Sequence, residues 1–183
     1  MSDDMREGSM TQLRRSGVLG EGELSCCPGV PCAERLAGGA CAVMECSEEI
    51  PCNPCEANCP RGAICIGHDV TSRPTLDAKQ CVGCGICVPR CPGLAIFVVD
   101  LSRDDGDRVT IPYEFLPLPK AGDPVQGLDR EGASVCRAEV LSVNAGAQND
   151  RTAAVTLWVP KGFGMRVRFF KREPKGVPHG ATG

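Results

Sequence analysis

The sequence has few of the large apolar residues from which a protein core is built. Leu, Ile, Val and Phe number 40 among 183 residues, whereas Gly and Pro together number 37. Chains this poor in apolar residues lie near the composition at which folding fails, so something other than burial is expected to hold part of the molecule together. The 14 Cys residues are the obvious candidates.

Long hydrophobic runs are also missing. The longest, residues 94–99, is far shorter than the roughly 20 residues that a membrane-spanning helix needs, so no membrane span is predicted. The chain starts with polar and acidic residues and no apolar stretch follows, which predicts that there is no secretory signal and that the location is cytoplasmic. In such a reducing compartment, dense Cys binds metal more often than it forms disulfides. A net charge of −3 gives no basic excess, so nucleic acid is not an expected partner.

The most informative segment is a run of four Cys residues that ends in Cys-Pro. Residues 81–92 read CVGCGICVPRCP, which is the spacing C-x2-C-x2-C-x3-C-P. Three thiolates on one tight loop can bind three irons of a 4Fe-4S cluster, and Gly83 and Gly85 let backbone N–H groups approach the sulfurs. A zinc ribbon would instead have two C-x2-C pairs separated by a longer spacer. The spacing therefore predicts an iron–sulfur cluster.

A similar pattern occurs earlier in the chain, at an offset of 32 residues. Three Cys residues and the Ala-Ile pair that follows them recur in both copies: Cys52, Cys55, Cys59 and Ala63-Ile64 align with Cys84, Cys87, Cys91 and Ala95-Ile96. Each copy is too small to bury a core by itself. The repeat predicts two similar half-units packed about an approximate two-fold axis.

The first copy departs from the pattern at one position, because Glu49 stands where Cys81 stands in the second. In one interpretation, residues 47–51 are an inserted loop and Cys46 supplies the missing thiolate; Cys41 is a less favoured substitute. In the other, the first site has only three thiolates and holds a three-iron cluster, or a cluster with a carboxylate from Glu49. We favour Cys46 because it lies close enough in the chain for an enlarged loop to bring it in.

In two-cluster ferredoxins the fourth Cys of each motif binds the other cluster. With that exchange, the predicted ligands of cluster one are Cys46, Cys52, Cys55 and Cys91, and those of cluster two are Cys81, Cys84, Cys87 and Cys59. The remaining cysteines are not expected to bind iron. We expect Cys65 and Cys136 to be small buried hydrophobic residues, and Cys26, Cys27 and Cys32 to be free thiols.

Residues 46–99 resemble the bacterial ferredoxins with two 4Fe-4S clusters, through both Cys-Pro motifs and the Ala-Ile segments after them. The likeness covers about a third of the chain and is more specific in its second half. It implies a ferredoxin-like fold and two 4Fe-4S clusters as cofactors.

A wider resemblance involves residues 45–60, 91–96 and 112–117. These segments look like those of small iron–sulfur subunits that accompany FAD-dependent amino- and imino-acid dehydrogenases of the proline and hydroxyproline type. This likeness implies that FAD is bound by a partner subunit, not by this chain. Electrons would then arrive from that flavin.

The C-terminal part reads as all-β. Short alternating runs separated by turn signals predict four strands, at about residues 124–128, 134–143, 153–160 and 165–170. Alternation places Cys136, Ala138 and Val140 on one face. Basic residues are frequent near the end of the chain: Lys161, Arg166, Arg168, Lys171, Arg172 and Lys175. We expect them to form a solvated face or a docking surface for an acidic partner.

The predicted fold class is α+β, with a ferredoxin-like two-cluster core, an irregular N-terminal arm and a small C-terminal β-barrel-like domain. The predicted divisions are an arm at 1–40, the two-cluster domain at 41–100, an extended linker at 101–122, the barrel-like domain at 123–172 and a flexible tail at 173–183.

Three functions fit these features. The first is a non-catalytic electron-transfer subunit that passes electrons from a flavin-containing dehydrogenase partner through two 4Fe-4S clusters to an acceptor, since a diffusible ferredoxin does not need the added segments. The second is a free two-cluster ferredoxin that shuttles electrons between enzymes. The third is an iron–sulfur enzyme or sensor in which an incomplete first cluster exposes an iron.

Overall fold

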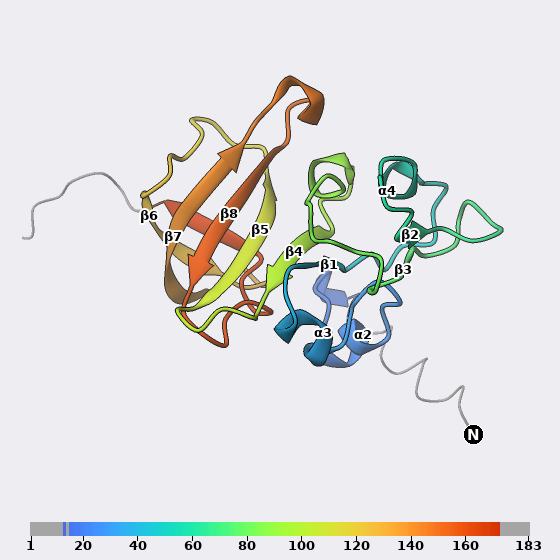
Figure 1. Ribbon diagram of the computed structural model, residues 1–183, viewed down its shortest axis with the longest axis horizontal. Helices are drawn as coiled ribbons and strands as arrows, with labels where there is room; N and C mark the ends of the chain where they lie inside the picture. Colours follow the sequence, from blue (N-terminus) through green and yellow to red (C-terminus); the bar gives the residue numbers. More distant parts are fainter. Residues whose placement is uncertain (1–12, 14, 173–183) are drawn as a thin grey trace, which may run out of the picture.

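The computed structural model describes residue 13 and residues 15–172. It has mixed secondary structure, mostly sheet with few and short helices (Figure 1). The elements are α2 (Glu21–Ser25), α3 (Ala33–Ala37), β1 (Cys41–Met44), α4 (Pro54–Ala57), β2 (Ile64–Cys65), β3 (Thr75–Leu76), η1 (Val88–Arg90), β4 (Ile96–Asp100), β5 (Asp107–Tyr113), β6 (Pro124–Leu128), β7 (Ser134–Asn144), η2 (Ala147–Asn149), β8 (Ala153–Val159) and β9 (Phe169–Arg172). Within this part of the chain, no helix has the length and apolar character to cross a bilayer.

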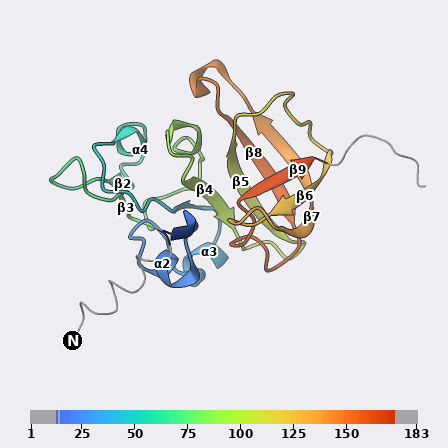
Figure 2. The same ribbon diagram turned by 180° about the vertical axis from the view of Figure 1, so that it is seen from behind.

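One antiparallel sheet runs through most of the molecule. Its seven strands follow the order β1-β4-β5-β8-β7-β6-β9, so β1, labelled in Figure 1, and β9, labelled in Figure 2, form its two edges. Because these edge strands do not pair with each other, the sheet is open. The expectation of a barrel-like C-terminal domain is corrected to this extent: the strands do not close into a barrel.

The strands of the C-terminal part are close to those predicted. β6, β7 and β8 occupy residues 124–128, 134–144 and 153–159, while β9 begins at residue 169 rather than 165. The predicted alternation is confirmed on β7, where Ala138 and Val140 are buried and their neighbours Arg137 and Glu139 are exposed. On β8, Val155, Leu157 and Val159 fill the main core.

The segment predicted as an extended linker contributes a strand to this sheet. β5 lies between β4 and β8 and pairs with β8 over its whole length, from Asp107 opposite Val159 to Tyr113 opposite Ala153. Its alternate residues, Val109, Ile111 and Tyr113, belong to the same core. The strands from both sides of residues 101–122 are therefore parts of one continuous sheet. The predicted tail at 173–183 lies outside the described residues.

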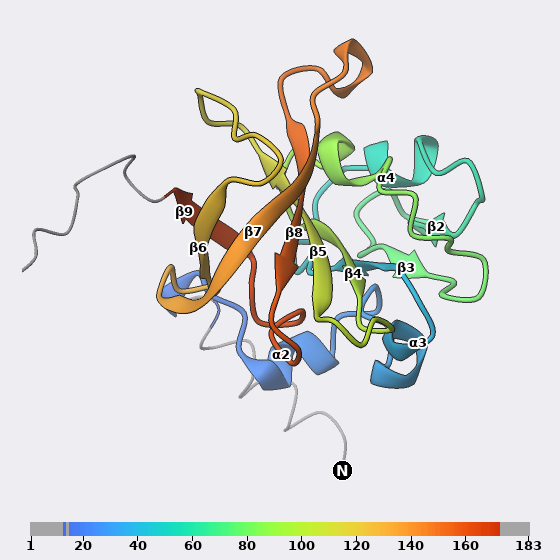
Figure 3. The same cartoon turned by 60° about the vertical axis from the view of Figure 1, so that its left-hand side comes forward.

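The repeat of 32 residues is visible in how strands pair around the Cys motifs. β1, which precedes the first motif, pairs with β4, which follows the second; β3, which precedes the second, pairs with β2, which follows the first. The register agrees to the residue, since Met44 pairs with Ile96 and Leu76 pairs with Ile64. This crossed pairing joins the two half-units, and Figure 3 labels three of the four strands, β2, β3 and β4.

The N-terminal arm is more ordered than its Gly and Pro content predicted. It holds two one-turn helices, α2 and α3. Leu36 of α3 is buried in the main core, and its carbonyl accepts a hydrogen bond from the backbone N–H of Leu101. The arm is thus attached to the sheet beside β4.

Candidate iron–sulfur centre

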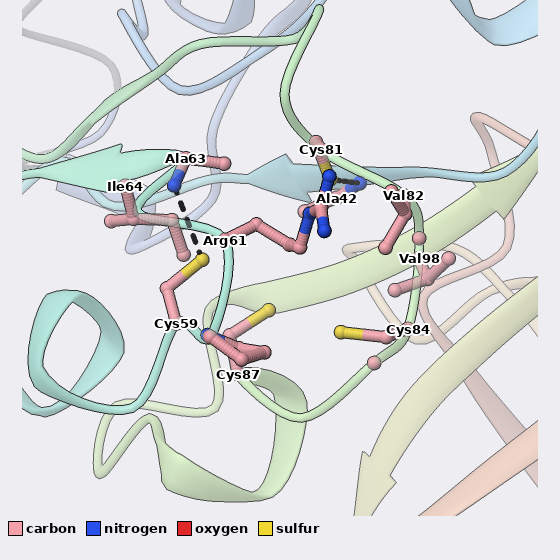
Figure 4. A pocket seen from close by; sticks show the side chains of 13 residues that line it. Ala42, Cys59, Arg61, Ala63, Ile64, Cys81, Val82, Cys84, Cys87 and Val98 are labelled. Carbon is pink, nitrogen blue, oxygen red and sulfur yellow. Dashed lines mark hydrogen bonds between the residues drawn. The ribbon is translucent and has the colours of Figure 1, made fainter.

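Four of the predicted ligands line one pocket. Cys81, Cys84 and Cys87 come from the loop before η1, and Cys59 comes from the segment after α4 in the other half of the repeat. Figure 4 shows Cys59, Cys84 and Cys87 around one space, with Cys81 beside Ala42. Among the described residues that line this pocket there is no His and no carboxylate. This set is the one predicted for cluster two.

The other four predicted ligands line a second, larger pocket. They come from the end of β1, from the start of α4 and from the segment after η1: Cys46, Cys52, Cys55 and Cys91. Glu49 also lines this pocket, but its side chain is 72% exposed and its carboxylate lies 3.8 Å from Arg73. Cys46 therefore lies with two thiols of its own motif and with Cys91 of the second motif. That all eight cysteines bind iron remains a prediction.

The structure places Cys41 away from the pocket predicted for cluster one, because Cys41 is not among the residues that line it. Cys41 is fully buried in β1, where its neighbour across the sheet is Val99 of β4. Its thiol is a neighbour of Cys81, a predicted ligand of cluster two. Cys41 is thus not placed to substitute for Cys46.

Backbone N–H groups point at three of the predicted ligand sulfurs. Ala63 N–H donates to Cys59 Sγ at 3.3 Å, and its counterpart in the repeat, Ala95 N–H, donates to Cys91 Sγ at 3.4 Å. Cys81 Sγ accepts from Ala42 N–H at 3.4 Å. Donors at these positions stabilise thiolates, the form of Cys that binds metal.

The protonation of the thiols follows their surroundings. The neighbouring Cys41 thiol lowers the pKa of Cys81 to about 5; burial opposes this shift, and the N–H groups of Ala42 and Gly83 reinforce it. Burial raises the pKa of Cys55 to about 11 and that of Cys87 to about 12. Cluster binding at these two positions must therefore release protons, because only the thiolate is a ligand.

The sulfurs match a 4Fe-4S cluster in number and in chemistry. Among residues 13 and 15–172, no three Cys, His, Asp or Glu side chains are grouped as the ligands of one metal ion. In a 4Fe-4S cluster each thiolate binds its own iron, so the four sulfurs stand apart around a common space. Four thiols around each of two pockets match that requirement in number and chemistry.

A buried charge network next to Cys46 was not predicted from the sequence. The Glu45 carboxylate accepts hydrogen bonds from Arg130 Nε at 2.8 Å and from Arg168 Nε at 2.6 Å. Arg168 lies over the ring of Phe97, with its Cζ atom 4.8 Å from the ring centroid. Arg168 is 6% exposed, so the prediction of a solvated basic face is wrong at this residue. The sequence gave no indication that Glu45 and Arg168 are in contact, because 123 residues separate them.

Among the remaining cysteines, Cys65 contradicts the prediction that it is buried. Cys65 is exposed, because β2 alternates and its buried position is Ile64. Cys27 is buried, whereas Cys26 and Cys32 are exposed. Cys136 is half-buried and packs against the main core. All are free thiols.

The comparison with protein families agrees with this geometry. Residues 74–97 match the 4Fe-4S binding domain. The matched segment contains Cys81, Cys84, Cys87 and Cys91. The chain therefore carries a ferredoxin-type segment of the kind that binds iron–sulfur clusters in electron-transfer proteins.

Several known proteins share part of the sequence. The chain is 36% identical over 58 residues to the ferredoxin-type protein NapF of Haemophilus influenzae, which covers 31% of this chain and 33% of that protein. It is 33% identical over 123 residues to the isethionate sulfite-lyase activating enzyme of Desulfovibrio desulfuricans, which covers 60% and 39%. It is 30% identical over 125 residues to ABC transporter E family member 1 of Arabidopsis thaliana, which covers 60% and 20%.

The chain thus spans from about a fifth to two fifths of the length of these relatives. No solved structure matches it. What these proteins share with it is a segment, and their names describe different activities.

Proposed function

We propose that the chain is a non-catalytic electron-transfer subunit that holds two 4Fe-4S clusters. The observation that carries this proposal is the division of eight cysteines into two sets of four, each lining its own pocket and each containing one Cys from the other half of the repeat. When bound, each cluster takes up and gives up one electron. The chain's own residues hold the irons as thiolates and direct backbone N–H groups at the sulfurs.

The division of the ligands supports a short electron path. Cys91 of the second motif lines the cluster-one pocket and Cys59 of the first motif lines the cluster-two pocket, so one stretch of backbone from each motif joins the two sites. Two clusters held on shared short segments lie near each other. Such a pair can pass an electron internally and accept or deliver it at opposite ends.

We further propose that the electrons come from a flavin-containing dehydrogenase partner. The basis is the resemblance of residues 45–60, 91–96 and 112–117 to the small subunits of such enzymes. Within the last of these segments, Phe115 and Leu116 are 62% and 84% exposed. Large apolar side chains this exposed are surface that a partner subunit would cover.

A free two-cluster ferredoxin is the second candidate, and the similarity to a ferredoxin-type protein favours it. The two candidates differ in their partners. Anaerobic purification of the intact particle from its native host, followed by a visible spectrum, separates them. Flavin absorption together with larger co-eluting subunits supports the dehydrogenase subunit. A single brown species without flavin contradicts it and supports the free ferredoxin.

A further inference from the structure

Cys81 makes contacts that lie outside the two Cys motifs. Its sulfur accepts a hydrogen bond from the Ala42 N–H at 3.4 Å, and the Cys41 thiol is its neighbour; both residues belong to β1. Cys59, another predicted ligand of cluster two, accepts a hydrogen bond from the Ala63 N–H, and this bond has its counterpart in the other half of the repeat, at Cys91. The two contacts from β1 to Cys81 come in addition to this repeated pattern. Donors to a ligand sulfur stabilise the added negative charge of a reduced cluster.

A cation also contacts the backbone of Cys81. The Arg35 guanidinium donates to four backbone carbonyls, including Ala78 O at 2.7 Å and Cys81 O at 2.8 Å. Among the described residues, no carboxylate lies within ion-pair distance of it. Its positive charge is therefore not offset by a neighbour, and it acts on cluster two through the Cys81 peptide.

The charges that line the two pockets differ in sign. The only charged residue among the described residues that line the cluster-two pocket is Arg61. The cluster-one pocket is lined by three carboxylates and two guanidiniums, those of Glu45, Glu48, Glu49, Arg130 and Arg168, so its wall is negative by one charge. A negative surrounding disfavours the addition of an electron, and a positive one favours it.

We infer that α3 and β1, through Cys41 and Arg35, raise the reduction potential of cluster two above that of cluster one. This inference rests on the proposed function, since it requires that both clusters be present. One electron from a reduced cluster one then passes to an oxidised cluster two, which leaves cluster one oxidised and cluster two reduced, with no proton or bond transferred. The electron leaves from the site at which Cys84 is exposed.

The test is an EPR-monitored redox titration of the full chain, isolated anaerobically, in which the signal lost in Cys84→Ala identifies cluster two. In the unsubstituted protein, cluster two is expected to become reduced at the higher potential. Cys41→Val removes the thiol donor and is expected to lower the potential of cluster two while that of cluster one is unchanged. Cys41→Ser keeps a donor and is expected to retain most of the original value.

Cys136→Val is the matched control, because this half-buried thiol packs against the main core and lines neither pocket. It is expected to change neither potential. Arg35→Gln provides a second probe that leaves β1 intact; it is expected to lower the potential of cluster two, and Arg35→Lys to lower it less.

Two results overturn the inference. One is a cluster-two potential that stays the same in both Cys41→Val and Arg35→Gln while iron content is unchanged. The other is a cluster two that is reduced after cluster one in the unsubstituted chain. An unsubstituted chain with only about four irons contradicts the two-cluster function itself, and this inference with it.

Discussion

Cys46 and Glu49 are the two candidates for the ligand that the first motif lacks, and their surroundings differ. Cys46 is half-buried and lines the pocket with three other thiols. Glu49 is largely exposed and its carboxylate lies near Arg73, in water. A soft iron site prefers the thiolate. The inserted residues 47–51 therefore act as a loop that lets Cys46 take the place of the Cys that is missing from the motif.

Cys46→Ala should convert the first site to a three-iron cluster or empty it. Iron per chain after anaerobic isolation should fall from about eight to about seven or four. Cys65→Ala is the matched control, since this exposed thiol lines neither pocket, and it should keep the full iron content. A Cys46→Ala chain that keeps the full content would contradict the assignment.

Glu49→Ala should leave the iron content unchanged. The carboxylate is exposed and its only ion-pair partner among the described residues is Arg73, at 3.8 Å, so its removal costs the fold less than about 1 kcal/mol. Iron analysis and the EPR spectrum of the reduced chain check this. Loss of one iron would instead support a carboxylate ligand.

Glu45→Gln should destabilise the protein by about 3 kcal/mol or more, because it leaves two guanidiniums without their counter-ion. Burial alone would raise the pKa of Glu45, but Arg130 and Arg168 outweigh it and hold the pKa below the ordinary value. The stabilisation is therefore complete above the unfolded carboxyl pKa, about 4.3, and is lost as the pH falls through the lower folded value.

Unfolding followed by the fluorescence of Trp158, the single Trp, measures this difference. The gap between the unsubstituted protein and Glu45→Gln should stay constant from neutral pH down to about pH 4.3 and should narrow only below it. Glu139→Gln, an exposed carboxylate on β7, is the control and should change little. A gap that closes well above that pH would show that the pKa of Glu45 is not depressed.

At the scale of elements, the loop that carries Cys81, Cys84 and Cys87 packs tightly against the segment before β1. Gly83 has φ +65°, and a Cβ atom there would lie 2.6 Å from Ala40 Cβ and 2.7 Å from the Ala40 carbonyl. These Ala40 atoms belong to the backbone or are fixed to it, so they cannot move aside as the end of a flexible side chain could. Gly83 is thus needed for both its conformation and its lack of a side chain.

Gly83→Ala should therefore displace the loop and remove the irons of cluster two, leaving about four per chain. Gly132→Ala is matched for conformation, with φ +80°, but a Cβ there meets nothing within 4 Å. It should lower stability by about 1 to 2 kcal/mol and leave the iron content intact. Equal iron loss in the two variants would mean that the clash with Ala40 does not matter.

The elements also show what the sequence could predict. The Cys spacing and the offset of the repeat, together with the ligand exchange of two-cluster ferredoxins and the choice of Cys46, grouped the eight cysteines into the two sets that line two pockets. Alternation identified β6, β7 and β8. The place of β5 in the sheet was not predicted, because three prolines in residues 111–119 suggested a connection. Pro112 is accommodated opposite Ala154 within the β5–β8 pair. The contact of Arg168 with Glu45 depends on tertiary packing, which local patterns do not encode.

At the scale of the whole molecule, the Cys-rich part and the C-terminal strands share one sheet. β4 pairs with β1 on one side and with β5 on the other, and the Glu45 network joins β1 to residues 130 and 168. A fragment that ends at residue 100 loses β5, one of the two partners of β4, and both partners of Glu45. The Cys-rich part is therefore expected to depend on the C-terminal strands for stability.

The fragment of residues 1–100 should bind much less iron than the full chain under the same anaerobic conditions. The control is a chain shortened only by residues 173–183, which should bind as much iron as the full protein. Iron analysis and circular dichroism give the readout. A 1–100 fragment with full iron content and an unchanged melting temperature would show that the two parts are independent.

The central claim is that each cluster takes its fourth ligand from the other motif. The EPR spectrum of the reduced Cys59→Ala chain tests it most directly. Cys59 lines the same pocket as Cys81, Cys84 and Cys87, so the signal that changes should be the one that changes in Cys81→Ala. A change instead in the signal that Cys52→Ala affects would contradict the exchange and the two-pocket assignment built on it.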